Sequence, residues 1–142
     1  MRAVALAACL LTTACAQIGF QQRPVRANHR EVRLSSGVVY EELSLGQGVA
    51  ATRGDRVELD YTLWLAGGTR VDSTLDRGVP IWITIGEAQV RGLDQGLVGM
   101  QAGGRRKIRV PAELGYGKEG VEDMIPPDAE LVFEVHLLTI GG

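Results

Sequence analysis

The chain has 142 residues, which is enough for one domain and a short additional segment. Apolar residues make up 45% of it, and 19 glycines favour a fold with many turns over a helical bundle. The formal net charge of -2 without a basic stripe argues against nucleic-acid binding, and both cysteines lie in the first fifteen residues, so the remainder cannot hold a disulfide. Two histidines are too few for a metal cluster, and we expect no metal and no other cofactor.

Residues 1–14 have the composition of a short secretory signal. Met1 and Arg2 precede an apolar stretch over residues 3–11, which is too short to span a bilayer as a helix. Small residues then lead to Cys15, a pattern that resembles the lipobox of bacterial lipoproteins, although Thr12 stands where leucine is usual. Two interpretations stay open: lipidation at Cys15, or a plain signal peptide, including one truncated by a wrongly assigned start codon. Both predict a domain outside the cytoplasm, in the periplasm, and only lipidation at Cys15 would attach it to a membrane.

Residues 15–34 are polar and lack sustained apolar spacing. This composition predicts a flexible tether, with the folded domain over residues 35–142. No internal repeat is visible, and we expect a monomer.

From residue 35 onward, apolar and polar residues alternate, which is the pattern of strands with one face on a core. Residues 56–65 show it most clearly, and Gly67 and Gly68 behind them supply a hairpin turn. Further strands are expected over four stretches, residues 38–45, 81–85, 108–110 and 131–137. The basic residues Arg105, Arg106, Lys107 and Arg109 are predicted to form a solvated strand face.

One segment departs from this alternation. Leu93, Leu97 and Met100 recur at helical spacing between two glycines, which predicts a single short amphipathic helix. Because several antiparallel strands with one helix must bury the helix against a sheet face, the predicted fold class is α+β, a curved antiparallel β-sheet wrapped around one short α-helix.

Seven short motifs follow one another between residues 37 and 140: VELDYT at 57–62, VDS at 71–73, PIWI at 80–83, GLDQGL at 92–97, PAELGYG at 111–117, IPP at 125–127 and LVFEV at 131–135. In this order and spacing they resemble the FKBP family of peptidyl-prolyl cis-trans isomerases, although each motif alone is weak. The resemblance implies an FKBP-like fold and an enzyme that acts on X-Pro bonds of proline-containing polypeptides.

The resemblance also implies a shallow apolar pocket for proline. Its catalytic residues would be Tyr61, Asp72, Tyr116 and Ile125, and its substrate-binding residues Val71, Ile81, Val90, Leu93 and Phe133. Leu93 would form the floor, and the Tyr116 hydroxyl and the Ile125 backbone N–H would bind peptide carbonyls. Asp72 would lie at the rim, hydrogen-bonded to the Tyr61 hydroxyl.

Such residues suit the reaction. Rotation of an X-Pro bond breaks amide resonance, a barrier of roughly 18–20 kcal/mol, and an apolar pocket withholds the water that stabilises the planar amide. Other interpretations remain for single residues: the apolar ones also fit core packing, Asp72 also fits a turn cap, whereas Tyr116 between two glycines favours a functional loop.

Three positions depart from the family pattern. Leu93 stands where tryptophan is common, and Val71 and Ile81 stand where phenylalanine is common; residues 86–92 are also one residue shorter than usual. We therefore expect a pocket poor in aromatic side chains, with weaker binding of rapamycin-like macrolides. The alternative function is an FKBP-fold binding module or chaperone with little or no isomerase activity.

Overall fold

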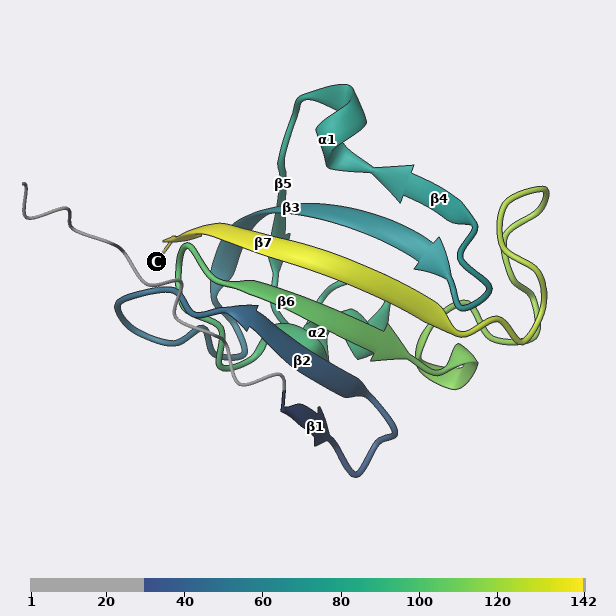
Figure 1. Ribbon diagram of the computed structural model, residues 1–142, viewed down its shortest axis with the longest axis horizontal. Coiled ribbons are helices and arrows are strands. Elements are labelled where there is room, and N and C mark those ends of the chain that lie inside the picture. Colours follow the sequence, from purple (N-terminus) through teal and green to yellow (C-terminus); the bar gives the residue numbers. More distant parts are fainter. Residues whose placement is uncertain (1–29, 142) are drawn as a thin grey trace, which may run out of the picture.

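A computed structural model describes residues 30–141 (Figure 1). The predicted signal segment, Cys15 and the tether up to residue 29 lie outside the described residues. The elements, in chain order, are β1 (Glu31–Arg33), β2 (Val39–Ser44), β3 (Arg56–Leu65), β4 (Arg70–Ser73), α1 (Thr74–Arg77), β5 (Ile81–Thr84), α2 (Arg91–Leu97), β6 (Arg105–Val110), the 3-10 turn η1 (Ala112–Leu114) and β7 (Leu131–Gly141).

The seven strands form one antiparallel sheet in the order β1-β2-β6-β7-β3-β4, and β5 also pairs with β3. The two longest strands, β3 and β7, pair along their full length at the centre (Figure 1). The other edge of β3 is shared: Leu59 pairs with β5, pairing with β4 resumes at Thr62, and neither strand pairs with the two residues between them. This interruption of the ladder lies beside the site described below.

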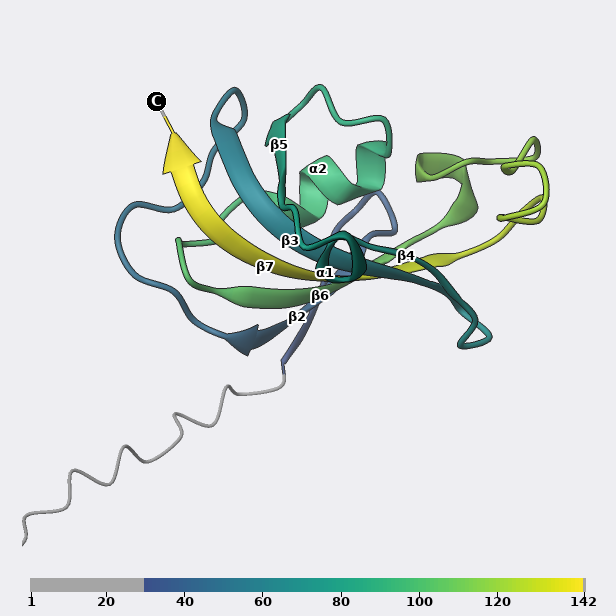
Figure 2. The same cartoon turned by 90° about the horizontal axis from the view of Figure 1, so that it is seen from above.

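Helix α2 covers the concave face of the sheet, as Figure 2 shows. Leu97 and Met100 are buried there with alternate residues of β3, β6 and β7. Glycine is required at two positions of the helix, because a Cβ on Gly92 would lie 2.3 Å from Val110 Cγ1 and one on Gly96 would lie 2.5 Å from Ile108 Cγ2. The predicted architecture, a curved antiparallel sheet around one short helix, is confirmed.

The elements that were not anticipated from the sequence include β1 and α1. Strand β1 pairs with β2, so the sheet begins at Glu31 and not at the predicted boundary of residue 35. Helix α1 is a single turn that starts at Ser73, whose side chain accepts a hydrogen bond from the Leu75 N–H, and it ends at Gly78 in the left-handed conformation (φ 66°).

The prediction of a fully solvated basic face on β6 is wrong for Arg106. Arg105 and Lys107 are exposed, but Arg106 is only 2% exposed. It shares its strand face with Ile108, which packs against α2, and therefore points into the protein, where it forms an ion pair with Glu42 of β2. A run of charges suggested solvent, but the alternation of the strand determined the direction of each side chain.

Candidate functional site

A hollow of about 440 Å³ opens on the α2 side of the sheet. It is lined by residues of β3, β4, β5, α2, β7 and the loops before α2 and β7: Tyr61, Leu63, Val71, Asp72, Ile81, Ile83, Ala88, Gln89, Val90, Leu93, Tyr116, Val121, Met124, Ile125 and Phe133. All nine pocket residues expected from the sequence are among them. The structure thus brings together side chains that are up to 72 positions apart in the chain (61 to 133).

Six lining residues were missed. Leu63 and Ile83 share the strand faces of Tyr61 and Ile81, so the alternation could have identified them. Ala88, Gln89, Val121 and Met124 belong to loops, where no periodicity indicates which side chains face the hollow.

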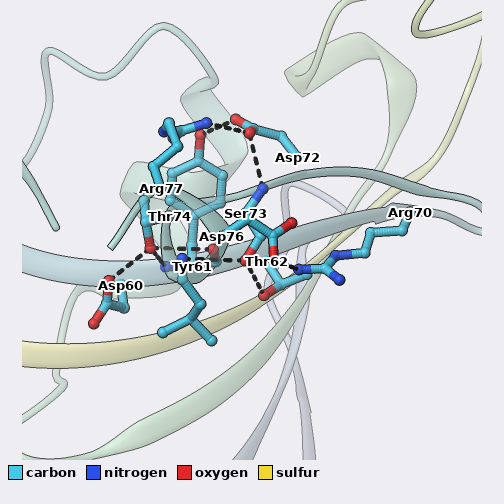
Figure 3. Close-up of polar contacts among 10 residues, drawn as sticks. Asp60, Tyr61, Thr62, Arg70, Asp72, Ser73, Thr74, Asp76 and Arg77 are labelled. Atoms are coloured by element: carbon cyan, nitrogen blue, oxygen red, sulfur yellow. Dashed lines mark hydrogen bonds and ion pairs between the residues drawn. The ribbon is translucent and has the colours of Figure 1, made fainter. Parts of the chain in front are cut away.

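The carboxylate of Asp72 is held at the rim of the hollow by three donors (Figure 3). The Tyr61 hydroxyl donates to Oδ2 at 2.5 Å, the Ser73 N–H donates to Oδ1 at 2.8 Å, and the Arg77 guanidinium forms an ion pair with Oδ1. The expected Tyr61–Asp72 hydrogen bond is therefore present, whereas the cap of the following turn is the Ser73 side chain and not Asp72. Partial burial disfavours the charge on Asp72, but the hydrogen bonds from Tyr61 and Arg77 outweigh it and lower the pKa of this carboxyl.

Tyr61 lies where the pairing of β3 with β5 and β4 is interrupted, and the side chain of Thr74 holds its backbone there. The hydroxyl of Thr74, which is fully buried, accepts the Tyr61 N–H at 3.0 Å and donates to Asp60 Oδ1 at 2.7 Å (Figure 3). The Tyr61 ring lies against Phe133, with centroids 6.0 Å apart and planes inclined by 56°. Burial, followed by the hydrogen bond to Asp72, raises the pKa of Tyr61, so its hydroxyl stays protonated as a donor.

Tyr116 follows the turn η1 and is half-buried in the hollow. Its hydroxyl has no hydrogen-bond partner among residues 30–141 and is free to bind a ligand group. Burial, with a smaller contribution from the charge on Asp72, raises the pKa of Tyr116. The hydroxyl is therefore a neutral donor at ordinary pH.

Ile125 contributes its side chain to the wall, but its backbone differs from expectation. Its N–H donates to the Val121 carbonyl at 2.8 Å, and the Val121 N–H donates back to the Ile125 carbonyl at 2.8 Å. The loop closes on itself in this way, so the N–H that was expected to bind a peptide carbonyl is already engaged.

The N–H of Val90 offers an alternative donor. Val90 lines the hollow immediately before α2, and within the described part of the chain its N–H has no acceptor. Leu93, one turn further on, is 6% exposed and closes the bottom of the hollow. The site therefore combines aliphatic and aromatic walls with two unengaged donors, at Val90 and Tyr116.

Over residues 30–141, no three or more His, Cys, Asp and Glu side chains are grouped so that they could hold a metal ion. In the same range, no helix has the length and apolar character needed to cross a membrane.

Comparison with known proteins places this geometry in context. The sequence model described as FKBP-type peptidyl-prolyl cis-trans isomerase matches residues 47–138. A protein of Neisseria meningitidis serogroup B named FK506-binding protein is 47% identical over 105 residues, which cover 73% of this chain and 96% of that protein. FK506-binding protein 2 of Dictyostelium discoideum is 43% identical over 94 residues, covering 66% and 71% of the two chains.

Solved structures are similar as well. The crystal structure of FkpA from Escherichia coli superimposes with a TM-score of 0.72 at 35% identity over 78% of this chain, but over only 51% of FkpA, so the match spans about half of that protein. A peptidyl-prolyl cis-trans isomerase from Pseudomonas syringae superimposes with a TM-score of 0.71 at 28% identity, covering 79% of this chain and 81% of the other.

Proposed function

This chain belongs to the family of FKBP-type peptidyl-prolyl cis-trans isomerases and is an enzyme of that type, and on this basis we propose that it assists the folding of proline-containing polypeptides outside the cytoplasm, acting as a monomer. The single observation that carries the assignment of the site is the hollow of about 440 Å³ in which all nine expected residues meet.

The proposed mechanism needs no covalent step. A proline ring enters the hollow against Leu93, and the aliphatic and aromatic walls keep water away from the preceding amide. A planar amide is stabilised by charge separation that water solvates, so removal of that water favours the twisted state. Each tenfold gain in rate requires about 1.4 kcal/mol of such preference.

The donors orient the peptide. We propose that the hydroxyl of Tyr116 and the N–H of Val90 bind carbonyl groups on either side of the rotating bond. Asp72 fixes the Tyr61 ring, and the ring in turn contacts Phe133 at the wall. These contacts hold one part of the peptide while the other part rotates, and they accelerate the reaction to the extent that they are better in the twisted state.

One observation favours a second candidate function. Val71, Ile81 and Leu93 make the floor and part of the wall of the hollow aliphatic, so fewer aromatic faces contact the proline ring than the family pattern provides. A binding module or chaperone that holds X-Pro segments would need only affinity and no preference for the twisted state.

Refolding of a protein whose slow phase is limited by an X-Pro bond distinguishes the two functions. An isomerase increases the rate constant of the slow phase in proportion to its concentration and at catalytic amounts. A holding chaperone leaves that rate constant unchanged or lowers it, and reaches its full effect only at stoichiometric amounts. Ala-Leu-Pro-Phe peptides, which lack tertiary structure, serve as the reference substrate.

The proposed location has a separate test. Mass spectrometry of the mature N-terminus from the native host should show either an acylated Cys15 as the first residue or a cleaved, unmodified segment. An intact Met1 in the cytoplasmic fraction would contradict export.

A further inference from the structure

Arg106 holds the end of α2 that is remote from the hollow. Its Nη1 donates to the Gly96 carbonyl at 2.7 Å and to the Val98 carbonyl at 2.9 Å, while Nη2 forms the ion pair with Glu42. The guanidinium also lies over the Tyr40 ring, 4.0 Å from its centroid. One buried side chain of β6 therefore joins the last turn of α2 to β2.

These contacts replace an ordinary helix cap. The last carbonyls of a helix have no partner within it and must find donors elsewhere when water is excluded. After Leu97 the chain leaves the helix at Val98 in an extended conformation (ψ 131°), without a left-handed residue at that position. Arg106 donates to the Gly96 and Val98 carbonyls, while the Leu97 carbonyl accepts the Met100 N–H at 3.1 Å. Backbone bonds between Ala51 and both Gly99 and Met100 hold the residues that follow, and Arg106 is the side chain of the sheet that bonds directly to the helix carbonyls.

The opposite end of the same helix forms part of the hollow. Val90 precedes α2 and Leu93 lies in its first turn, so both move with the helix. Seven residues span only about 10 Å at 1.5 Å per residue, and a helix this short moves nearly as a rigid body. A shift at Val98 would therefore displace the floor of the hollow.

The apolar contacts beneath α2 fix its position along β6 less well than the hydrogen bonds of Arg106 do. Gly96 rests on Ile108 and Gly92 rests on Val110, and both contacts limit how closely the helix approaches β6. Dispersion contacts are individually weak and non-directional, so they permit small sliding movements that hydrogen bonds resist.

We infer that Arg106 is a positioning residue of the isomerase, which caps α2 and thereby holds Leu93 and the Val90 N–H in place for the substrate. The inference rests on the proposed use of the hollow. It goes beyond the pocket itself because Arg106 is not among the residues that line it.

Four variants together separate positioning from simple stabilisation. Glu42→Gln removes the ion pair but leaves both bonds to the helix carbonyls, whereas Arg106→Met removes all of these contacts. Arg106→Lys keeps the charge but cannot serve both carbonyls and Glu42 with the geometry of a guanidinium. Arg105→Met is the matched control, because Arg105 is the exposed neighbour on the other face of β6.

The readouts are kcat and KM at a temperature well below each melting transition, together with the NMR signals of the Val90 and Leu93 amides. We expect kcat/KM of Arg106→Met to fall about tenfold, mainly through kcat, because a displaced donor and floor affect the twisted state more than initial binding. Arg106→Lys should retain an intermediate rate and carries the test if Arg106→Met does not fold. Glu42→Gln and Arg105→Met should stay within about twofold of the unmodified protein.

The inference is overturned if Arg106→Met and Arg106→Lys lower the melting temperature but keep kcat/KM and both amide signals unchanged, or if Glu42→Gln reduces kcat/KM as much as Arg106→Met. If the unmodified protein shows no catalysis, the proposed function fails instead. In that event the two amide signals still report whether Arg106 positions α2.

Discussion

Replacement of Gly96 by alanine sets helix propensity against packing. Alanine is better than glycine in a helix by about 1 kcal/mol, so propensity alone predicts a more stable protein. The new Cβ, however, would lie 2.5, 2.7 and 2.9 Å from three side-chain atoms of Ile108, where an ordinary contact is about 3.5–4.0 Å. Ile108 is fully buried and cannot turn away into solvent.

The packing effect should win. Overpacking of a buried site typically costs about 1–3 kcal/mol, and overlap with three atoms places Gly96→Ala near the upper end. After the gain in propensity is subtracted, we expect the free energy of unfolding to fall by about 2 kcal/mol. Urea denaturation followed by circular dichroism measures this value if the transition is two-state.

The control is Gly67→Ala in the turn between β3 and β4, where a Cβ meets no atom within 4 Å. Its stability should stay within about 0.5 kcal/mol of the original protein. A Gly96→Ala protein that is as stable as the original, or more stable, would refute the close contact between α2 and β6.

Three other outcomes follow from the site. Tyr61→Phe removes the 2.5 Å hydrogen bond to Asp72 but leaves the contacts of that carboxylate with Arg77 and Ser73. Urea denaturation should therefore show a free energy of unfolding lower by about 1 kcal/mol, and the peptide assay should show a several-fold lower rate. An unchanged rate would argue against the role of Tyr61. The rate should be constant with pH from about 5 to 9, because the pKa of Asp72 is lowered and those of Tyr61 and Tyr116 are raised. The stability that Asp72 contributes is lost only when acid protonates it, and the stability that the tyrosines contribute is lost only when alkali ionises them. A midpoint near neutrality in a pH–rate profile would contradict these directions. Leu93→Trp should strengthen binding of a rapamycin-like macrolide in isothermal titration calorimetry, since it restores a broad aromatic floor; equal or weaker binding would show that the floor does not limit affinity.

The sequence was most informative where local periodicity and side-chain direction coincide. The alternation over residues 56–65 matched the bounds of β3, and helical spacing placed Leu93 and Leu97 on the buried side of α2. The family resemblance identified the nine pocket residues. Periodicity alone could not have identified them, because they come from six different segments.

The missed features depend on contacts between distant segments. The direction of Arg106 followed from strand alternation, but the presence of Glu42 as its partner, 64 positions away, could not be read from β6 alone. The engagement of the Ile125 N–H by Val121 depends on the path of a loop that has no period. The role of Thr74 in filling the interrupted ladder at Tyr61 required knowledge of where β5 and β4 end.

The central claim is that X-Pro bonds rotate inside the hollow, and a protease-coupled assay on an Ala-Leu-Pro-Phe peptide tests it most directly. The cis-to-trans rate constant should rise linearly with protein concentration, and this increase should drop strongly in Tyr116→Phe and Asp72→Ala proteins whose circular dichroism spectra are unchanged. A rate equal to that of the peptide alone, or an acceleration that both variants retain in full, would contradict the claim.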